Sequence, residues 1–381
     1  MLNTSRLLIL ILLFSTNLTF AQSDSAYKRK NPFACSVTID YGREENTDPF
    51  FPPVTNNSYS VELDFNQQTT GKQAWQTLQN YPRFGGEIIF TSIGNPKIFG
   101  DAIGLLPTLQ YSIIKHHRNR LYYQVGTGLA YITKPFNIIT NPENDVAGSR
   151  IDEAVVIRAG YEITLSSKSQ ISPSFTFIHY SNGSAREPNL GYDIYSLGIT
   201  YRFRGNEKTP LSPTRKQFRD SLPPLSHGLH IQAFGALGFE GGSTPGGPEY
   251  HVYIANFSLV KYIKHKNKIS IGVDQSYNNG GLDYEKLEEI NTGQNQSYQA
   301  SGTALFAGYE WLFGHFGLAI HLGPYIKRPI EASSKIFENM GLQYYIWNPI
   351  THYGSNLFIG VHVQTYFGQA SYDDVSLGVT F

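Results

Sequence analysis

Cysteine is nearly missing from this chain of 381 residues, and Cys35 is the only one. A single thiol excludes an internal disulfide framework and a cysteine-based metal cluster. Charge is also scarce: 16% of the residues are charged, and the 30 basic side chains balance the 30 acidic ones. Because a net charge of zero offers no attraction to a polyanion, we expect no nucleic acid partner.

Long apolar runs are missing too, except at the N-terminus. Residues 1–21 carry one basic residue, Arg6, then an apolar core at 7–14 and the small residue Ala21, which together predict a secretory signal peptide. Cys35 lies well past that cleavage site, so we do not expect a lipoprotein anchor. Beyond residue 21 no apolar run is long enough for a membrane helix.

What the chain does contain is aromatic residues, 14% of the total, together with 36 glycines and many short alternating segments. Residues 154–165 alternate clearly: Val155 and Ile157 fall on one face, Arg158 and Glu162 on the other. An apolar outer face and a polar inner face are typical of an outer-membrane β-barrel. We therefore expect Arg158, Glu162 and Arg202 to point into the lumen and form ion pairs there. A secreted β-sandwich is the soluble alternative.

The segments divide into two halves. The first contains eight candidate strands, at 34–41, 58–66, 84–91, 103–114, 121–132, 154–165, 172–180 and 193–203. Residues 205–226 are rich in proline and basic residues and predict a linker. Eight more strand candidates follow near Leu229, Val252, Ile269, Ala304, Gly317, Gly341, Leu357 and Val375.

The predicted fold is all-β, an outer-membrane antiparallel β-barrel organised as two tandem eight-stranded halves; one larger barrel is the alternative. The expected domains are a signal peptide at 1–21, a catalytic barrel at 31–204, a linker at 205–226 and a second barrel-like half at 227–381. Residues 159–162 and 195–200 each have a counterpart in the second half, at 307–310 and 375–380. The two offsets differ, so duplication and convergent barrel patterning both stay open.

A polar cluster lies at one end of an apolar face in the first half. Strands 172–180 and 193–203 are joined by a polar loop, and alternation puts His179, Ser181 and Asp193 on the same apolar side at its loop end. A base, a hydroxyl and a carboxylate on such a face predict an esterase that works on a lipid. In the second half, His362 lies on the opposite face from its apolar neighbours, so we expect no copy of the site there.

Loop lengths suggest an orientation. Long loops at 42–57, 133–152 and 182–192 alternate with shorter ones such as 115–120 and 166–168. If the chain starts in the periplasm, the long loops fall outside the cell. The predicted site then faces the outer leaflet of the outer membrane.

The stretch 179–193 resembles the lipid A 3-O-deacylase family, whose members are eight-stranded outer-membrane barrels that remove the ester-linked acyl chain at the 3-position of lipid A. The family motif is a histidine, a serine two residues on, an asparagine at ten and a glutamate at fourteen. These spacings match His179, Ser181, Asn189 and Asp193. The resemblance covers about residues 31–203. This chain departs from the family at Asp193, which is one methylene shorter than glutamate.

The resemblance implies a serine esterase acting on lipid A, or lipopolysaccharide, in the outer leaflet. In the mechanism of a Ser-His-Asp triad, Ser181 attacks the ester carbonyl, His179 takes the proton of the Ser181 hydroxyl, and Asp193 holds the imidazole in the required tautomer. Asn189, together with Asn182 or loop backbone N–H groups, is expected to donate to the oxyanion. We expect no cofactor and no metal.

Two other functions stay open. Outer-membrane phospholipase A also has a His-x-Ser-Asn-Gly stretch, which residues 179–183 match, but that family uses an asparagine as the histidine's partner and requires calcium. The acid at position 193 and the preceding Pro188-Asn189 pair favour the deacylase. A non-enzymatic structural barrel, adhesin or small porin is the second alternative.

Overall fold

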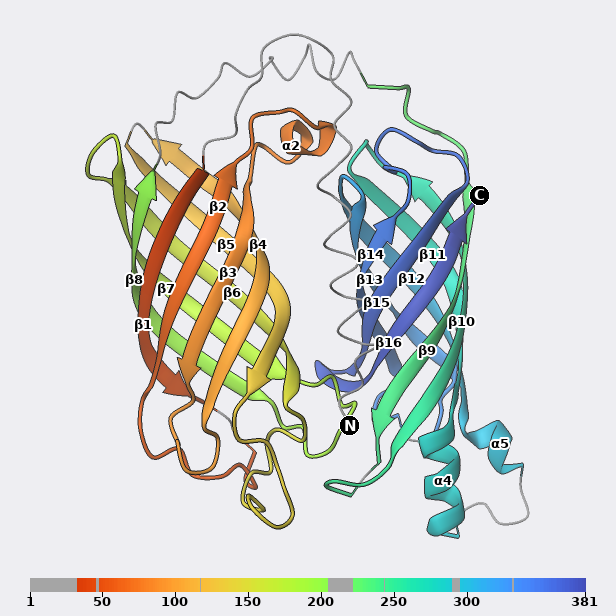
Figure 1. The fold of residues 1–381 in the computed structure, drawn as a ribbon. Coiled ribbons are helices and arrows are strands. Elements are labelled where there is room, and N and C mark those ends of the chain that lie inside the picture. The colour runs from red at the N-terminus through yellow and green to blue at the C-terminus, as the bar shows by residue number, and fades with distance from the viewer. Residues whose placement is uncertain are drawn as a thin grey trace. The chain divides into compact units, whose positions relative to one another are not determined.

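The computed structural model describes residues 33–45, 48–116, 118–204, 222–242, 244–289, 295–330 and 332–381. The predicted signal peptide and most of the predicted linker lie outside these residues. The described chain forms two closed antiparallel barrels of eight strands each (Figure 1). The prediction of two eight-stranded barrels is confirmed, and the alternative of one larger barrel is wrong.

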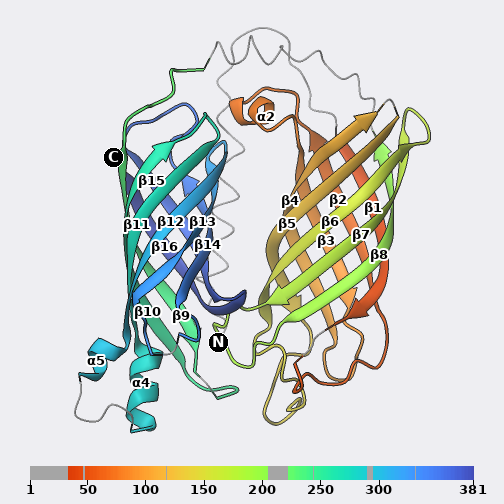
Figure 2. The same ribbon diagram turned by 180° about the vertical axis from the view of Figure 1, so that it is seen from behind.

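The first barrel follows chain order around its ring, as Figures 1 and 2 show from opposite sides. It closes where β8 pairs with β1, with Ile199 opposite Ile39. The short helix α2 (Ala74–Leu78) lies between its second and third strands. The strands are β1 (Phe33–Glu44), β2 (Ser58–Gln68), β3 (Arg83–Ser92), β4 (Asp101–His116), β5 (Asn119–Ile132), β6 (Ile151–Thr164), β7 (Ser169–Ser181) and β8 (Tyr192–Arg204).

The second barrel closes where β16 pairs with β9. Two helices, α4 (Asn279–Leu287) and α5 (Gln296–Gln299), lie between its third and fourth strands. All eight strand positions expected in this half fall in or next to a strand. The strands are β9 (His230–Gly241), β10 (Glu249–Tyr262), β11 (Asn267–Asn278), β12 (Ser301–Phe313), β13 (Phe316–Lys327), β14 (Ile336–Tyr345), β15 (Asn356–Tyr366) and β16 (Gln369–Thr380).

Alternation gives each strand an apolar outer face and a polar inner face. On β7 and β8, the exposed side includes Phe175, Leu197 and Ile199, while Thr176 and Ser196 are buried inside. The same division holds around the first ring, where large apolar side chains such as Ile39, Leu105 and Ile157 are exposed. Of the helices in the described ranges, none is long and apolar enough to cross a membrane.

Buried ion pairs fill the middle of the first lumen. Arg158 pairs with three carboxylates, at 3.2 Å from Glu87, 3.7 Å from Asp40 and in closer contact with Glu62. Glu162 in turn accepts from Arg83 at 2.5 Å and Arg120 at 3.1 Å, and lies 3.9 Å from Arg202. The predicted lumen ion pairing of Arg158, Glu162 and Arg202 is therefore confirmed.

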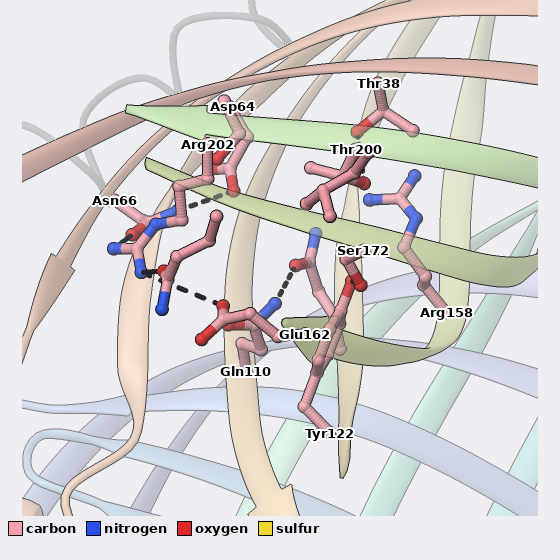
Figure 3. A pocket seen from close by; sticks show the side chains of 14 residues that line it. Thr38, Asp64, Asn66, Gln110, Tyr122, Arg158, Glu162, Ser172, Thr200 and Arg202 are labelled. Carbon is pink, nitrogen blue, oxygen red and sulfur yellow. Dashed lines mark hydrogen bonds and ion pairs between the residues drawn. The ribbon is translucent and has the colours of Figure 1, made fainter. Parts of the chain in front are cut away.

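Arg158, Glu162 and Arg202 line a small cavity in the lumen (Figure 3). The cavity that they line, with Tyr122, Ser172 and Thr200 among its other walls, has a volume of about 20 Å³. A water molecule requires roughly 10–15 Å³ of such space. The cavity therefore has the size of a site for ordered water between the ion pairs, and it is far too small for a solute.

Toward the long loops the lumen changes from polar to apolar. Ile178, the one apolar residue on the inner side of its strand, lies in a buried cluster with Tyr180, Tyr192 and Ile194. Phe99 and Val146, from the loops that follow β3 and β5, belong to the same cluster. The loops therefore pack against this buried apolar cluster at this end of the barrel.

The closed ring predicts that the first barrel folds on its own, because its strands leave no unpaired edge. We expect residues 22–204, refolded in detergent, to give a β-rich, protease-resistant and heat-modifiable barrel. Circular dichroism, limited proteolysis and gel mobility with and without heating measure this. Residues 22–191, which lack β8, are the matched control and should stay protease-sensitive. Failure of the longer fragment to fold without residues 227–381 would contradict the prediction.

Candidate active site

His179 and Asp193 meet across the last hairpin of the first barrel. They are directly paired positions of β7 and β8, and His179 Nδ1 lies 2.7 Å from Asp193 Oδ1. A carboxylate accepts hydrogen bonds, so this contact assigns the proton to Nδ1 and leaves the Nε2 lone pair available as a base. Both side chains keep about a third of their surface exposed, 34% and 35%. The pair therefore remains accessible from the outer face.

Ser181 lies at the end of the same strand, where two groups are placed to donate to its hydroxyl. Gly183 donates its backbone N–H to Ser181 Oγ at 3.1 Å. Asn189 Nδ2 lies 3.3 Å from the same oxygen. The Asn189 carboxamide oxygen accepts from the Asn182 backbone N–H at 3.0 Å and from the Ser181 hydroxyl at 3.4 Å, so both ends of the carboxamide lie beside Ser181.

The loop that follows Ser181 is braced from within. The Asn182 side chain makes two hydrogen bonds to the backbone of Arg186. It donates to the carbonyl at 2.9 Å and accepts from the N–H at 3.2 Å. Glu187 accepts from the Ser184 hydroxyl at 2.9 Å and from the Asn189 N–H at 3.1 Å. Burial raises the pKa of the Glu187 carboxyl, and these two donors oppose that rise. The loop thus holds Asn189 beside Ser181 before any substrate arrives.

Backbone contacts fix the other partners of the site. The Asp193 N–H donates to Glu44 Oε1 at 3.0 Å, and its carbonyl accepts from the Glu45 N–H at 2.9 Å, so the end of β1 holds Asp193 on both sides. Gly191 adopts φ +73° and lies so close to the imidazole that an added Cβ would be 3.0 Å from His179 Cε1. Only a residue without a side chain fits there without displacing the ring.

The structure thus brings the predicted residues together as two adjacent pairs, His179 with Asp193 and Ser181 with Asn189. Among the described contacts there is no hydrogen bond between Ser181 Oγ and the imidazole; in resting enzymes this contact is often long and shortens on substrate binding. The aspartate reaches its partner despite its shorter side chain. The Asn182 side chain, expected as an oxyanion donor, braces the loop instead.

Sequence reasoning missed two supporting groups, Gly191 and Glu187, and expected loop N–H donors without naming the one at Gly183. The two glycines lie in the polar loop between the motif residues, and both adopt positive φ. Glu187 carried no signal in the sequence, since a loop glutamate is most often solvated.

The second barrel contains a similar pair turned inward. His362 Nδ1 lies 2.7 Å from Asp374 Oδ1, and the two side chains are 0% and 2% exposed. The prediction that His362 faces away from its apolar neighbours is confirmed. Its partner is Asp374, a residue that the sequence pattern did not single out. Because it is enclosed in the lumen, this pair has no access to lipid.

The arrangement in the first barrel suits nucleophilic acyl transfer. It combines a hydroxyl, an imidazole with a free nitrogen oriented by a carboxylate, and two N–H donors directed at the hydroxyl oxygen. In the part of the chain that is described, no group of three or more His, Cys, Asp or Glu side chains is placed to hold a metal ion.

Two family models match the chain. The model described as lipid A 3-O-deacylase (PagL) matches residues 59–202, and the model described as acyloxyacyl hydrolase, C-terminal domain, matches residues 227–381. The boundary between them falls between the two barrels. No curated protein matches the chain.

Among solved structures, the outer membrane enzyme PagL is 18% identical and aligns over 44% of this chain and 97% of its own, with a TM-score of 0.30. Neisserial surface protein A (NspA) is 9% identical over 46% of this chain and 97% of its own, with a TM-score of 0.30. Omp33 of Acinetobacter baumannii is 7% identical over 92% of this chain and 97% of its own, with a TM-score of 0.16.

The close approach of Gly191 to His179 predicts a positioning effect. In Gly191→Ala the new methyl pushes the imidazole by a few tenths of an ångström, and we expect kcat/KM for ester hydrolysis to fall about tenfold or more. The matched control is Gly368→Ala, at φ +82° with nothing within 4 Å of the added Cβ. It carries the same backbone strain and should hydrolyse the ester as the parent does. Equal activity of the two variants would contradict the prediction.

Proposed function

The first half of this chain belongs to the lipid A 3-O-deacylase family, and we propose that the protein is an outer-membrane serine esterase that removes the ester-linked acyl chain from the 3-position of lipid A. The observation that carries the proposal is the 2.7 Å contact between His179 and Asp193 on the outer face, next to Ser181. It supplies an oriented base beside a hydroxyl on the side of the barrel that meets lipid.

In the proposed mechanism Ser181 Oγ attacks the ester carbonyl while His179 Nε2 takes the hydroxyl proton. Asp193 keeps the other imidazole proton on Nδ1 and stabilises the imidazolium that forms. Collapse of the tetrahedral intermediate expels the sugar oxygen, which takes the proton from Nε2. Water, deprotonated by the same imidazole, then releases the fatty acid from the acyl-serine and restores the hydroxyl.

The oxyanion forms within reach of Ser181 Oγ, where the Gly183 N–H and Asn189 Nδ2 already point. One such donor typically contributes about 3 kcal/mol to the transition state. Both are positioned by bonds within the loop rather than by substrate, so little reorganisation is needed at the moment of reaction. This supports Asn189 and the Gly183 N–H in the role of oxyanion donors.

The substrate is proposed to approach from the membrane. Phe177 packs against His179 with ring centroids 6.5 Å apart and against Tyr195 at 4.9 Å, so an aromatic surface begins beside the dyad. An acyl chain lying along this surface stays in an apolar environment while its ester reaches Ser181. With the long loops outside the cell, the site meets lipid A in the outer leaflet.

The alternatives are weighed by separate observations. The packed lumen of the first barrel, with its cavity of about 20 Å³, argues against a porin in that half. The histidine partner at position 193 is a carboxylate, whereas outer-membrane phospholipase A uses an asparagine. The phospholipase remains the second candidate because residues 179–183 also match its motif.

Mass spectrometry of lipid A from cells with and without the protein tests the proposal. The parent should produce lipid A lighter by one 3-linked acyl chain. Ser181→Ala and His179→Asn should each reduce the reaction by at least about 10³-fold, whereas Asp193→Ala should retain more activity, as orienting residues often do.

Ser169→Ala, at the far end of the same strand, is the matched control and should keep full activity. Heat modifiability on a gel checks that each variant is folded. Deacylation that persists in Ser181→Ala would remove this hydroxyl from the mechanism.

Chelation separates the two lipid hydrolases. A site that holds its own carboxylate against the imidazole needs no cation to stabilise the imidazolium, so activity in detergent micelles should survive EDTA. Released fatty acid is measured before and after chelation and again after calcium is restored. Complete loss that calcium reverses would move the assignment to the phospholipase.

A further inference from the structure

Glu153 lies directly across from Ser181 on the side away from Asp193. The two are paired positions of β6 and β7, and the next pair on the same face, one step farther from the long loops, is Val155 with His179. Cross-strand partners have Cβ atoms about 4.5–5.5 Å apart. The Glu153 carboxylate is also near enough to interact electrostatically with the imidazole. The nucleophile is therefore flanked by an acid on each neighbouring strand.

Glu153 is the one charged residue on the outward side of its strand. It is exposed on the outward side of β6, whose other outward residues are Ile151, Val155, Ile157, Ala159, Tyr161 and Ile163. Among the described contacts of the chain, none is a hydrogen bond or an ion pair of its side chain. A carboxylate without a partner on a lipid-facing surface is unfavourable, and in membrane proteins such a residue marks a functional site.

No group in the described part of the chain donates a hydrogen bond to this carboxylate, which leaves it available to a substrate. Asp193 occupies His179 Nδ1, and Nε2 is required by Ser181 in the proposed mechanism, so the imidazole has no proton to give. A phosphate cannot serve, because two anions repel. The remaining partner is an N–H or O–H group of the substrate next to the ester.

We propose that Glu153 is a specificity-determining residue that accepts a hydrogen bond from an N–H or O–H group on the sugar carbon adjoining the scissile ester. This inference rests on the proposed deacylase function. In an acylated glucosamine with its ester at the 3-position, the 2-position carries an amide N–H one carbon away. The Cβ spacing of about 4.5–5.5 Å that is general for directly opposite cross-strand residues suits adjacent positions on one sugar ring. Simple fatty esters lack such a donor.

Two probes, used on the full-length protein in detergent micelles, separate this role from a general effect on the site. One is 2-N-acyl-3-O-acyl-glucosamine 1-phosphate, which has the donor; the other is p-nitrophenyl laurate, which does not. The variants are Glu153→Gln, which keeps the shape and removes the charge, and Glu153→Ala. Glu143→Gln, in the exposed loop before β6, removes one negative charge from the same end of the barrel and is the control.

For Glu153→Ala we expect kcat/KM on the glucosamine ester to fall roughly 10- to 100-fold, the range for a lost hydrogen bond to a charged group. Glu153→Gln, whose amide oxygen still accepts but carries no charge, should lose less. Hydrolysis of the nitrophenyl ester should change less than about threefold in both variants. Equal losses on both probes, or no loss on either, would overturn the inference. If the parent cleaves the nitrophenyl ester but not the glucosamine ester, the proposed function itself fails.

Discussion

Closure of each sheet through backbone hydrogen bonds is the constraint on which the rest of this protein depends. In lipid, every backbone N–H and C=O must be paired within the structure, and only a ring without edges achieves this with strands. The pairing of β8 with β1 and of β16 with β9 satisfies it twice. Once a ring is closed, each position has one of two environments. Odd and even residues along a strand therefore carry different chemistry: apolar and aromatic outside, ion pairs inside.

The two histidine–aspartate pairs illustrate how much this parity decides. Both have a 2.7 Å contact between Nδ1 and a carboxylate oxygen across a hairpin. His179 and Asp193 point outward and keep a third of their surface, whereas His362 and Asp374 point inward and are enclosed. The two pairs therefore differ in which side of the strand they occupy. The outward pair can meet a lipid ester, whereas the inward pair belongs to the lumen.

The outward site is supported by a rigid interior. Ion pairs around Arg158 and Glu162 fill the middle of the lumen, and an apolar layer around Ile178 and Tyr192 lies beneath the loops. The loop bearing Asn189 is braced by its own side chains and contacts the preceding long loop, where Gly191 donates to the Val146 carbonyl at 3.4 Å. A site built this way keeps its donors oriented without substrate, as efficient acyl transfer requires.

The sequence by itself determined the strands and the face that each residue occupies, and it predicted the main site residues, because period-two alternation and the spacing of His179, Ser181 and Asp193 are local properties. It did not determine the register in which neighbouring strands pair. The register depends on contacts between strands, and it placed Glu153 opposite Ser181. The fold also put the matching segments 159–162 and 307–310 on the sixth strand of one barrel and the fourth of the other, whereas 195–200 and 375–380 both lie on closing strands. The backbone group to which a loop side chain bonds, as Asn182 bonds to the Arg186 carbonyl, likewise depends on backbone geometry that residue type does not encode.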